Sequence, residues 1–229
     1  MPTSPPPLVQ VMDVQKEYVL GHRTVRALRG LTLEIPRGGF VVMQGPSGSG
    51  KTTLLNLIGC IDHPTSGRVV VAGQDVGRLG DRELSQFRAR KLGFVFQNFN
   101  LIPVLSAVEN VEYPLRLNGI PADEARTRAL AMLEAMDLRD EAFQRPAELS
   151  GGQCQRVAIG RALVTQPELV VADEPTANLD SRTGEMIITV MHDMRDRFGT
   201  TFLISTHDPD VAAHAEQCWH LRDGLLSDA

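Results

Sequence analysis

Gly45-Pro46-Ser47-Gly48-Ser49-Gly50-Lys51-Thr52 is a glycine-rich run that ends in a lysine and a threonine. Its glycines allow successive backbone N–H groups to turn toward a polyphosphate, because no Cβ atom stands in the way. Lys51 adds a positive charge for the β- and γ-phosphate oxygens, and Thr52 offers a hydroxyl to Mg²⁺. Such a loop needs a buried strand before it and a helix after it, and residues 40–43 and 52–58 have these two patterns. The stretch therefore predicts a phosphate-binding loop in an α/β protein.

The alternative interpretation of this loop is a surface turn rich in glycine and serine. The chain has only three lysines, Lys16, Lys51 and Lys91, beside twenty arginines. A lysine at the position where the motif requires one is therefore informative. We interpret the stretch as a nucleotide-binding loop.

The composition is that of a folded globular protein. With 229 residues and 42% hydrophobic content, the chain has enough apolar side chains for a sizeable core. Its net charge of −5 and its lack of basic blocks argue against nucleic-acid binding, which needs clustered lysine and arginine. Cys60, Cys154 and Cys218 form no metal-ligand or redox pattern and fit a reducing compartment.

The N-terminal residues 1–7 are rich in proline and lack the basic and apolar regions of a signal peptide. We predict a disordered lead there. No apolar run approaches the roughly 20 residues that a bilayer span requires, so we expect a soluble chain.

The order of the predicted elements indicates an α/β core that is interrupted by a helical insert. Strand patterns come early, helical periodicity fills the middle, and the order strand, helix, strand returns near the end. The predicted strands cover residues 8–14, 25–35, 40–43, 68–72, 168–172 and 201–205. The predicted helices cover residues 52–58, 81–91, 107–117, 122–136, 151–164 and 183–198.

Two carboxylates, Asp173 and Glu174, follow the predicted apolar strand 168–172. Because α/β proteins place ligands at the carboxyl edge of their sheets, both are candidate site residues. Asp173 is placed to hold Mg²⁺ through its water shell, and Glu174 can polarise a water molecule for attack on a γ-phosphate. The alternative is that the two acids simply begin a turn before Pro175. A phosphate-binding loop in the same chain favours the catalytic interpretation.

Together these motifs resemble the nucleotide-binding subunit of an ABC transporter, and the likeness runs from Tyr18 to His207 in the family's order. Residues 149–153, Leu-Ser-Gly-Gly-Gln, resemble the family signature and are the most diagnostic segment. The resemblance implies an α/β P-loop NTPase of the ABC ATPase fold, with a RecA-like core, an antiparallel β subdomain and an inserted helical subdomain. It implies a single ABC ATPase domain over residues 8–229. Its core and β subdomain would cover about 8–97 and 165–229, and its helical subdomain about 98–164.

The resemblance also implies a role for each motif residue. Gln97 resembles the Q-loop glutamine that joins the Mg²⁺ shell, residues 178–180 resemble the D-loop, and His207 resembles the switch histidine. Tyr18 stands where the family stacks an aromatic ring on adenine. The expected cofactors are ATP and Mg²⁺; the expected catalytic residues are Glu174, His207 and Gln97, and the expected metal ligands are Thr52, Gln97 and Asp173. The expected ATP-binding residues are Tyr18, Gly45, Pro46, Ser47, Gly48, Ser49, Gly50, Lys51, Thr52, Thr53, Ser150, Gly151, Gly152, Gln153 and Asp180.

Several of these residues have a simpler interpretation. Tyr18 alone is typical of a half-buried strand residue, Gln97 of a loop amide, and His207 of a surface histidine. Ser150, followed by two glycines, is typical of a helix N-cap. That interpretation agrees with an anion site, because a helix N-terminus attracts negative charge.

The resemblance further implies partners. In this family the signature meets the γ-phosphate that the other subunit binds, so we expect a homodimer around two ATP molecules. We also expect a transmembrane permease and a cytoplasmic chain held peripherally at the inner face of the plasma membrane through that permease. Cys154 and Gly160 depart from the family pattern, but neither is a phosphate ligand, and we expect both sites of the dimer to be competent.

The subfamily is indicated by residues 93–103, 109–111 and 177–180. They are similar to ATPases of the lipoprotein-releasing and macrolide-exporting group, whose membrane partners transmit force to the periplasm. A cell-division ATPase that regulates cell-wall hydrolases is an alternative. ABC ATPases that act on DNA or ribosomes are a second alternative, although they generally carry long coiled-coil insertions or tandem cassettes.

The run at residues 99–105 is too apolar for a free surface loop. We predict that part of it packs inside the helical insert and that the rest lines a groove for a short helix of the membrane subunit. The alternative is that all seven residues belong to the core.

Overall fold

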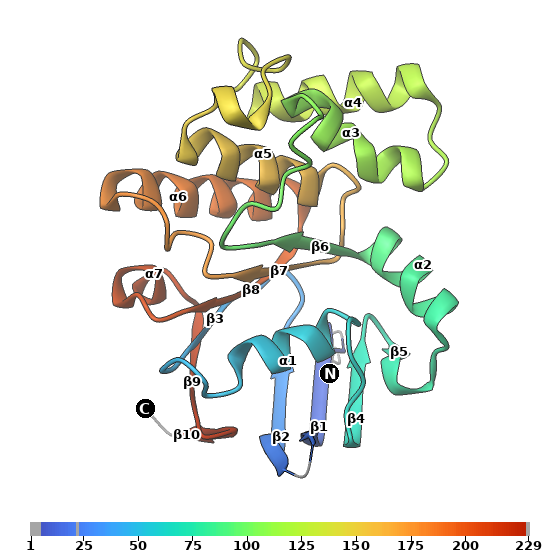
Figure 1. Ribbon diagram of the computed structural model, residues 1–229, viewed down its shortest axis with the longest axis vertical. Coiled ribbons are helices and arrows are strands. Elements are labelled where there is room, and N and C mark those ends of the chain that lie inside the picture. The colour runs from blue at the N-terminus through green and yellow to red at the C-terminus, as the bar shows by residue number, and fades with distance from the viewer. Residues whose placement is uncertain (1–5, 22, 228–229) are drawn as a thin grey trace, which may run out of the picture. The chain divides into compact units, whose positions relative to one another are not determined.

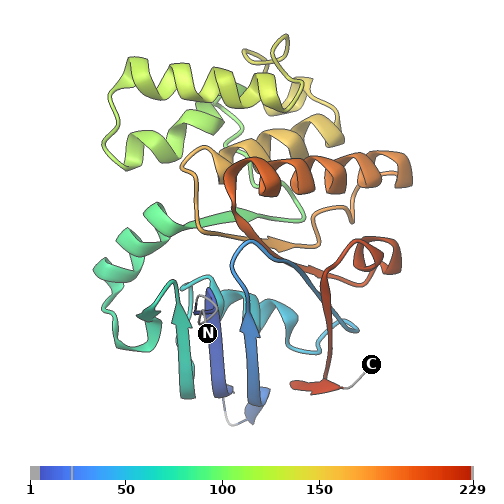
Figure 2. The same ribbon diagram turned by 180° about the vertical axis from the view of Figure 1, so that it is seen from behind.

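The computed structural model describes residues 6–21 and 23–227, and the chain divides into two compact units (Figures 1 and 2). The first runs to Arg88 and resumes at Thr201, and the second is Ala89–Thr200. The predicted subdomain boundaries near residues 97 and 165 stay a prediction. The predicted disordered lead falls mostly on residues 1–5, which lie outside the described residues.

The first unit contains an antiparallel sheet with the strand order β2-β1-β4-β5. Side chains of β2 alternate between buried and exposed from Leu31 to Ile35, so this part of the strand buries one face. The strands are β1 (Val9–Leu20), β2 (Arg23–Ile35), β4 (Ser66–Val71) and β5 (Gln74–Asp75), and the 3-10 helix Val76–Arg78 and α2 (Asp81–Lys91) follow them.

The same unit carries the strand that leads into the phosphate loop. β3 (Phe40–Gln44) pairs in parallel with β8 (Thr201–Thr206) and with β9 (Gln217–Arg222), and β9 pairs antiparallel with β10 (Leu225–Ser227). β3 and β8 are buried along nearly their whole length, as is typical of parallel strands. α1 (Lys51–Ile58) follows β3, and α7 (Pro209–Ala213) follows β8.

The second unit contains a parallel pair of strands and a group of helices. β6 (Leu92–Val95) pairs in parallel with β7 (Leu169–Asp173). The helices are α3 (Ala107–Leu117), α4 (Ala122–Ala135), α5 (Gly151–Leu163) and α6 (Ser181–Phe198), with a 3-10 turn at Pro146–Glu148. α5 packs against α3, α4 and α6 (Figure 1), so Val157, Ile159 and Leu163 on α5 are fully buried.

Most predicted elements are confirmed, with shifted ends. The predicted helix 107–117 has the bounds of α3, and the predicted strand 8–14 is too short because β1 continues through register shifts to Leu20. β5, β6, β9, β10 and α7 lie outside the predicted elements, because each is short or only partly buried. In the part of the chain that the structure describes, no helix is long and apolar enough to cross a membrane.

Candidate nucleotide-binding site

The phosphate loop joins β3 to α1 in the first unit, and its glycines determine its path. Gly50 precedes α1 with a left-handed φ of 108°, and a Cβ there would lie 2.7 Å from the Ala27 carbonyl oxygen. A Cβ on Gly45 would lie 2.1 Å from the Leu221 carbonyl oxygen. Only glycine fits these two positions, so the backbone keeps the tight turn that a phosphate-binding loop needs.

Lys51 is held inside this loop. Its Nζ donates to the carbonyl oxygens of Gly45 at 2.7 Å and Pro46 at 3.2 Å, and the residue is only 8% exposed. Ser49 Oγ is buried and has no hydrogen-bond partner among the described residues. A confined ammonium and a buried hydroxyl of this kind suit phosphate oxygens, which would satisfy both groups. The adjacent Thr52 is exposed.

The predicted switch histidine lies at the same sheet edge as this loop. Gln44 of β3 is in register with Thr206 of the parallel β8, so Gly45 and His207 both follow the carboxyl ends of neighbouring strands. His207 is exposed, and the next residue, Asp208, caps α7 with its side chain. The structure therefore brings two of the predicted phosphate-contacting segments together.

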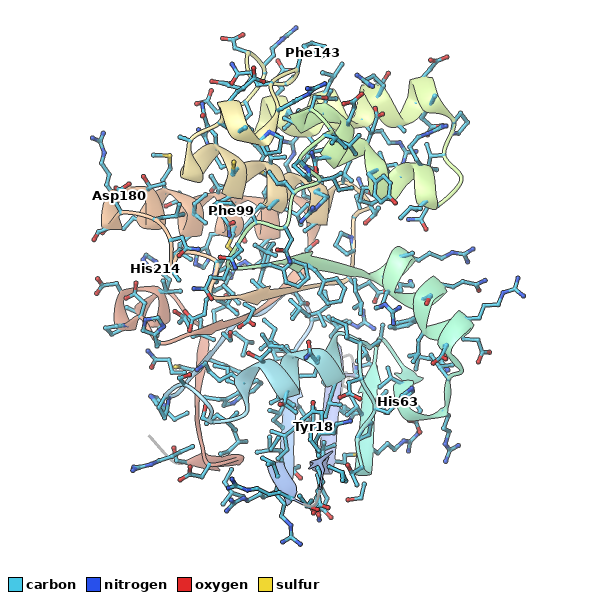
Figure 3. The ribbon with its side chains drawn as sticks, viewed as in Figure 1. Tyr18, His63, Phe99, Phe143, Asp180 and His214 are labelled. Carbon is cyan, nitrogen blue, oxygen red and sulfur yellow. The ribbon has the colours of Figure 1, made fainter. Side chains whose placement is uncertain are left out.

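Tyr18 lies in β1 (Figure 3), where a polar network holds its side chain. Its hydroxyl donates to Asp62 Oδ2 at 3.0 Å, and Lys16 Nζ lies 4.9 Å from the centre of its ring. Lys16 is nearly buried, and its Nζ donates to Asp62 Oδ1 at 2.6 Å and to the His63 carbonyl oxygen at 2.7 Å. A charged pair thus fixes the ring that the sequence predicts to stack on adenine.

The protonation of this network follows from its surroundings. Burial raises the pKa of Tyr18, and its hydrogen bond to Asp62 raises the pKa further, so the hydroxyl remains a donor. Burial also acts to raise the pKa of Asp62. Hydrogen bonds from Lys16, the His63 N–H and Tyr18 outweigh that effect and hold the pKa of this carboxyl below its ordinary value.

In the second unit, β7 ends at Asp173 and the chain turns sharply at Glu174. Glu174 has a left-handed φ of 48°, which costs a residue with a side chain about 1–2 kcal/mol. The Ala177 N–H donates to the Glu174 carbonyl oxygen at 3.3 Å and closes a turn, with Pro175 at the position where proline is favoured. A strained residue directly after a carboxylate-bearing strand end is typical of functional sites.

Gln97 follows β6 and is exposed, at the sheet edge where the parallel β7 ends in Asp173. Asn178 anchors this loop, because its Nδ2 donates to the Gln97 carbonyl oxygen at 3.0 Å and to Asn98 Oδ1 at 3.1 Å. The structure therefore brings the predicted Q-loop residue and the predicted metal-binding carboxylate to one edge of the β6–β7 pair.

The residues after Gln97 are anchored from α5. Phe99 (Figure 3) and Asn100 both have left-handed φ angles, of 59° and 48°. Arg161 on α5 donates to the Phe99 carbonyl oxygen at 2.8 Å and to the Asn100 carbonyl oxygen at 2.5 Å. The guanidinium thus stabilises a backbone conformation that is unfavourable by itself.

The predicted signature forms the start of α5. Ser150 caps this helix, accepting a hydrogen bond from the Gln153 N–H at 3.3 Å, while Gln153 Oε1 accepts from the Ser150 N–H at 2.8 Å. This helix start borders a cavity of about 270 Å³. Asp180, which caps α6 (Figure 3), borders it too. This cavity is lined by Ser150, Gly151, Gly152, Gln153, Arg156, Asn178, Leu179, Asp180, Thr183, Met186 and Ile187. The signature and the D-loop carboxylate therefore meet at a helix N-terminus, where anions are favoured.

Four residues of these networks were not among the predicted site residues: Lys16, Asp62, Asn178 and Arg161. Two of them had a local signal, since Lys16 is one of three lysines in the chain and Asn178 lies in the predicted D-loop. Asp62 and Arg161 act through partners distant in the sequence, which no local pattern reveals.

A glycine-rich loop after a buried strand, with an enclosed lysine, defines a P-loop nucleotide-binding protein. Residues 28–177 match the family model described as ABC transporter, and the chain belongs to this family. It is 44% identical over 220 residues to the lipoprotein-releasing system ATP-binding protein LolD of Alcanivorax borkumensis, covering 96% of each chain.

The chain is also 48% identical over 221 residues to the macrolide export ATP-binding/permease protein MacB of Syntrophobacter fumaroxidans, covering 96% of this chain and 31% of that protein. It thus spans about a third of the length of MacB. Among solved structures, the dimeric post-hydrolysis state of the ATP-binding cassette MJ0796 bound to ADP and Pi matches with a TM-score of 0.89 and 44% identity. That match covers 96% of this chain and 97% of that chain. The predicted ABC ATPase fold and family resemblance are confirmed, and the chain is an ATP-binding cassette of this family.

Proposed function

We propose that this chain hydrolyses ATP with Mg²⁺ as a homodimer and thereby drives a transmembrane permease at the cytoplasmic face of the plasma membrane. The observation that carries the proposal is the presence of two phosphate-binding features in one chain. One is the loop around Lys51, and the other is the capped helix start after Ser150. The dimeric cassette MJ0796, bound to ADP and Pi, supports both the pairing and the hydrolysis.

The expected metal ligands fit Mg²⁺. Thr52, Gln97 and Asp173 offer hydroxyl, amide and carboxylate oxygens, which are the hard donors that this ion prefers. Across residues 6–21 and 23–227, no three acidic, histidine or cysteine side chains form a metal cage. Mg²⁺ at phosphate sites is typically held by one or two carboxylates together with phosphate oxygens and water. When bound, Mg²⁺ would neutralise charge that develops on the phosphates.

Other residues of this chain have separate roles in binding and hydrolysing ATP. Lys51 holds the β- and γ-phosphates, and Tyr18 stacks on adenine with its ring fixed by Asp62. Glu174 accepts a proton from the attacking water and orients it. His207 contacts the γ-phosphate from the end of β8.

Dimerisation follows from the signature. The cavity at the start of α5 presents the Ser150 hydroxyl and the N–H groups of Gly151 and Gly152. We infer that these groups receive the γ-phosphate bound to Lys51 of a second copy. ATP would then hold the two copies together, and hydrolysis would release them.

The permease is proposed to dock on the segment 99–105. The Asn110 side chain, fully buried in α3, hydrogen-bonds the backbone of Ile102 and Leu105 and so orders this segment. Val104 in the same segment is 71% exposed. An ordered loop that exposes an apolar side chain suits a partner helix. The likeness to LolD and MacB supports a membrane partner of the lipoprotein-release or macrolide-export type.

The replacement Glu174→Gln tests the proposal, because it keeps size and hydrogen bonding but removes the proton acceptor. ATP should still bind, turnover should fall by about 10²-fold or more, and Mg-ATP should trap a dimer that light scattering detects. Lys51→Ala should instead weaken ATP binding itself. Hydrolysis by the Gln variant at the parental rate would refute the role of Glu174, and a Gln variant that stays monomeric at saturating Mg-ATP, alone and with its permease, would refute the dimer.

A further inference from the structure

Gln155 is a fully buried polar residue to which no role has been assigned so far. It lies on α5 with 0% exposure, and its Nε2 donates to the Pro175 carbonyl oxygen at 2.6 Å in a buried hydrogen bond. Its Oε1 is also buried and has no partner among the described residues. An unpaired buried oxygen destabilises a fold, and an apolar side chain of the same size would avoid that penalty. The unpaired Oε1 therefore offsets part of what the Nε2 hydrogen bond contributes to stability.

The hydrogen bond of Gln155 reaches the turn that carries Glu174. Pro175 is buried and directly follows Glu174, whose φ of 48° is unfavourable for a residue with a side chain. Within the turn, the Ala177 N–H donates to the Glu174 carbonyl oxygen at 3.3 Å. The bond from Gln155 is shorter and fixes the orientation of the next peptide group. Without it, the Pro175 carbonyl would be buried and unpaired, and the peptide group after Pro175 would lose the hydrogen bond that fixes its orientation.

We propose that Gln155 is a positioning residue that holds Glu174 in its strained conformation through the Pro175 carbonyl. The inference rests on the proposed function, because it takes Glu174 as the proton acceptor. It also gives α5 a second role, because the helix that starts with Ser150 would hold the proton acceptor of its own chain while its N-terminus contacts the nucleotide of the second copy. A displacement of that helix start would then be transmitted to Glu174 within about one helical turn.

The test compares Gln155→Met with Ile159→Ala. Methionine has similar length and volume, removes both polar atoms and is well tolerated in helices and cores. Ile159 is fully buried one turn further along α5, so its truncation costs stability without touching the turn. We expect Gln155→Met to lower kcat by about 10- to 100-fold, with KM for ATP little changed. The urea midpoint should also change little, because the variant removes one buried unpaired oxygen, Gln155 Oε1, and leaves another, the Pro175 carbonyl. We expect Ile159→Ala to lower the urea midpoint and leave kcat unchanged.

A second comparison distinguishes a positioning role of Gln155 from a general structural role. If Gln155 acts through Glu174, Gln155→Met should leave the residual single-turnover rate of Glu174→Gln unchanged, since no proton acceptor remains to be positioned. An equal loss in both backgrounds, or a parental kcat for Gln155→Met, would overturn the proposal. If the methionine variant does not fold, Gln155→Asn keeps the amide but shortens its reach, and the same kcat loss is expected.

The inference also has a readout that is independent of catalysis. Hydrogen exchange at the Ala177 amide should become faster in Gln155→Met than in the parent and in Ile159→Ala. Absence of ATP hydrolysis by the parent protein would refute the proposed function. Unchanged exchange at Ala177 would refute the link between Gln155 and the turn.

Discussion

Replacing Gly152 with alanine should destabilise the second unit through one defined contact. A Cβ at this position would lie 2.6 Å from Thr183 Cγ2, well inside van der Waals distance. Thr183 cannot turn away freely, because its Oγ1 donates to Asp180 Oδ2 at 2.6 Å and its N–H donates to Asp180 Oδ1 at 3.1 Å. Such overpacking costs about 1–3 kcal/mol, and replacing a helical glycine with alanine returns up to about 1 kcal/mol. We therefore expect Gly152→Ala to lower the free energy of unfolding, measured in urea, by about 1–2 kcal/mol.

The contact can be relieved without removing the cap. Thr183→Ser deletes Cγ2 but keeps the hydroxyl that Asp180 accepts from, so Gly152→Ala should be neutral or slightly stabilising in that background. The double-mutant cycle should give a coupling of about 1–3 kcal/mol. Gly151→Ala is the matched control, because a Cβ there would lie 3.5 Å from Leu179 Cδ2, an ordinary contact. If Gly152→Ala lowers the free energy of unfolding equally with threonine or serine at position 183, the contact with Thr183 Cγ2 is not the cause of the destabilisation.

Two further predictions concern Asp62 and the segment 99–105. The pKa of Asp62 is held below its ordinary value, so the stability this gives is complete above about pH 4 and is lost as pH falls through the native pKa. Asp62→Asn should lower the free energy of unfolding at pH 7 and flatten its dependence on pH between about 2 and 5. Urea titrations at several pH values measure this dependence, and a pH dependence equal to that of the parent would contradict the prediction. Val104→Asp should leave folding and ATP binding intact but abolish co-purification with the permease, whereas Val19→Asp, at an equally exposed valine, should not. Retained co-purification of the Val104 variant would remove segment 99–105 from consideration as the docking site.

The parts of the structure that follow from local patterns were predictable from the sequence. α3 has its predicted bounds because Ser106 and Glu109 form a capping box at its start, which is a signal within four residues. β6 was not predicted as a strand, because four residues are too few to show a period.

The candidate site likewise has parts that were predictable from local patterns and parts that were not. The phosphate loop, the signature and the carboxylates after β7 are contiguous motifs, and the sequence indicates each of them. The contacts that hold them are not contiguous: Asn178 bonds a residue 81 positions away, and Lys16 pairs with Asp62 across 46 positions. Only the folded chain brings such partners together, so a single sequence contains no local signal for these pairings.

Arg161 anchors a loop whose backbone conformation is unfavourable by itself. Phe99 and Asn100 are both left-handed, a conformation that costs a residue about 1–2 kcal/mol, and two hydrogen bonds from one guanidinium oppose that cost. The conformation of the loop therefore depends on Arg161, and a loss of about 1.4 kcal/mol from the contacts of this arginine would make that conformation tenfold less favourable relative to a relaxed one. A shift of α5 that breaks these two hydrogen bonds would remove the support of the segment that follows Gln97, with no new contact to the glutamine itself. The conformation after Gln97 is thus set by the balance between the hydrogen bonds of one arginine and the backbone strain of two residues.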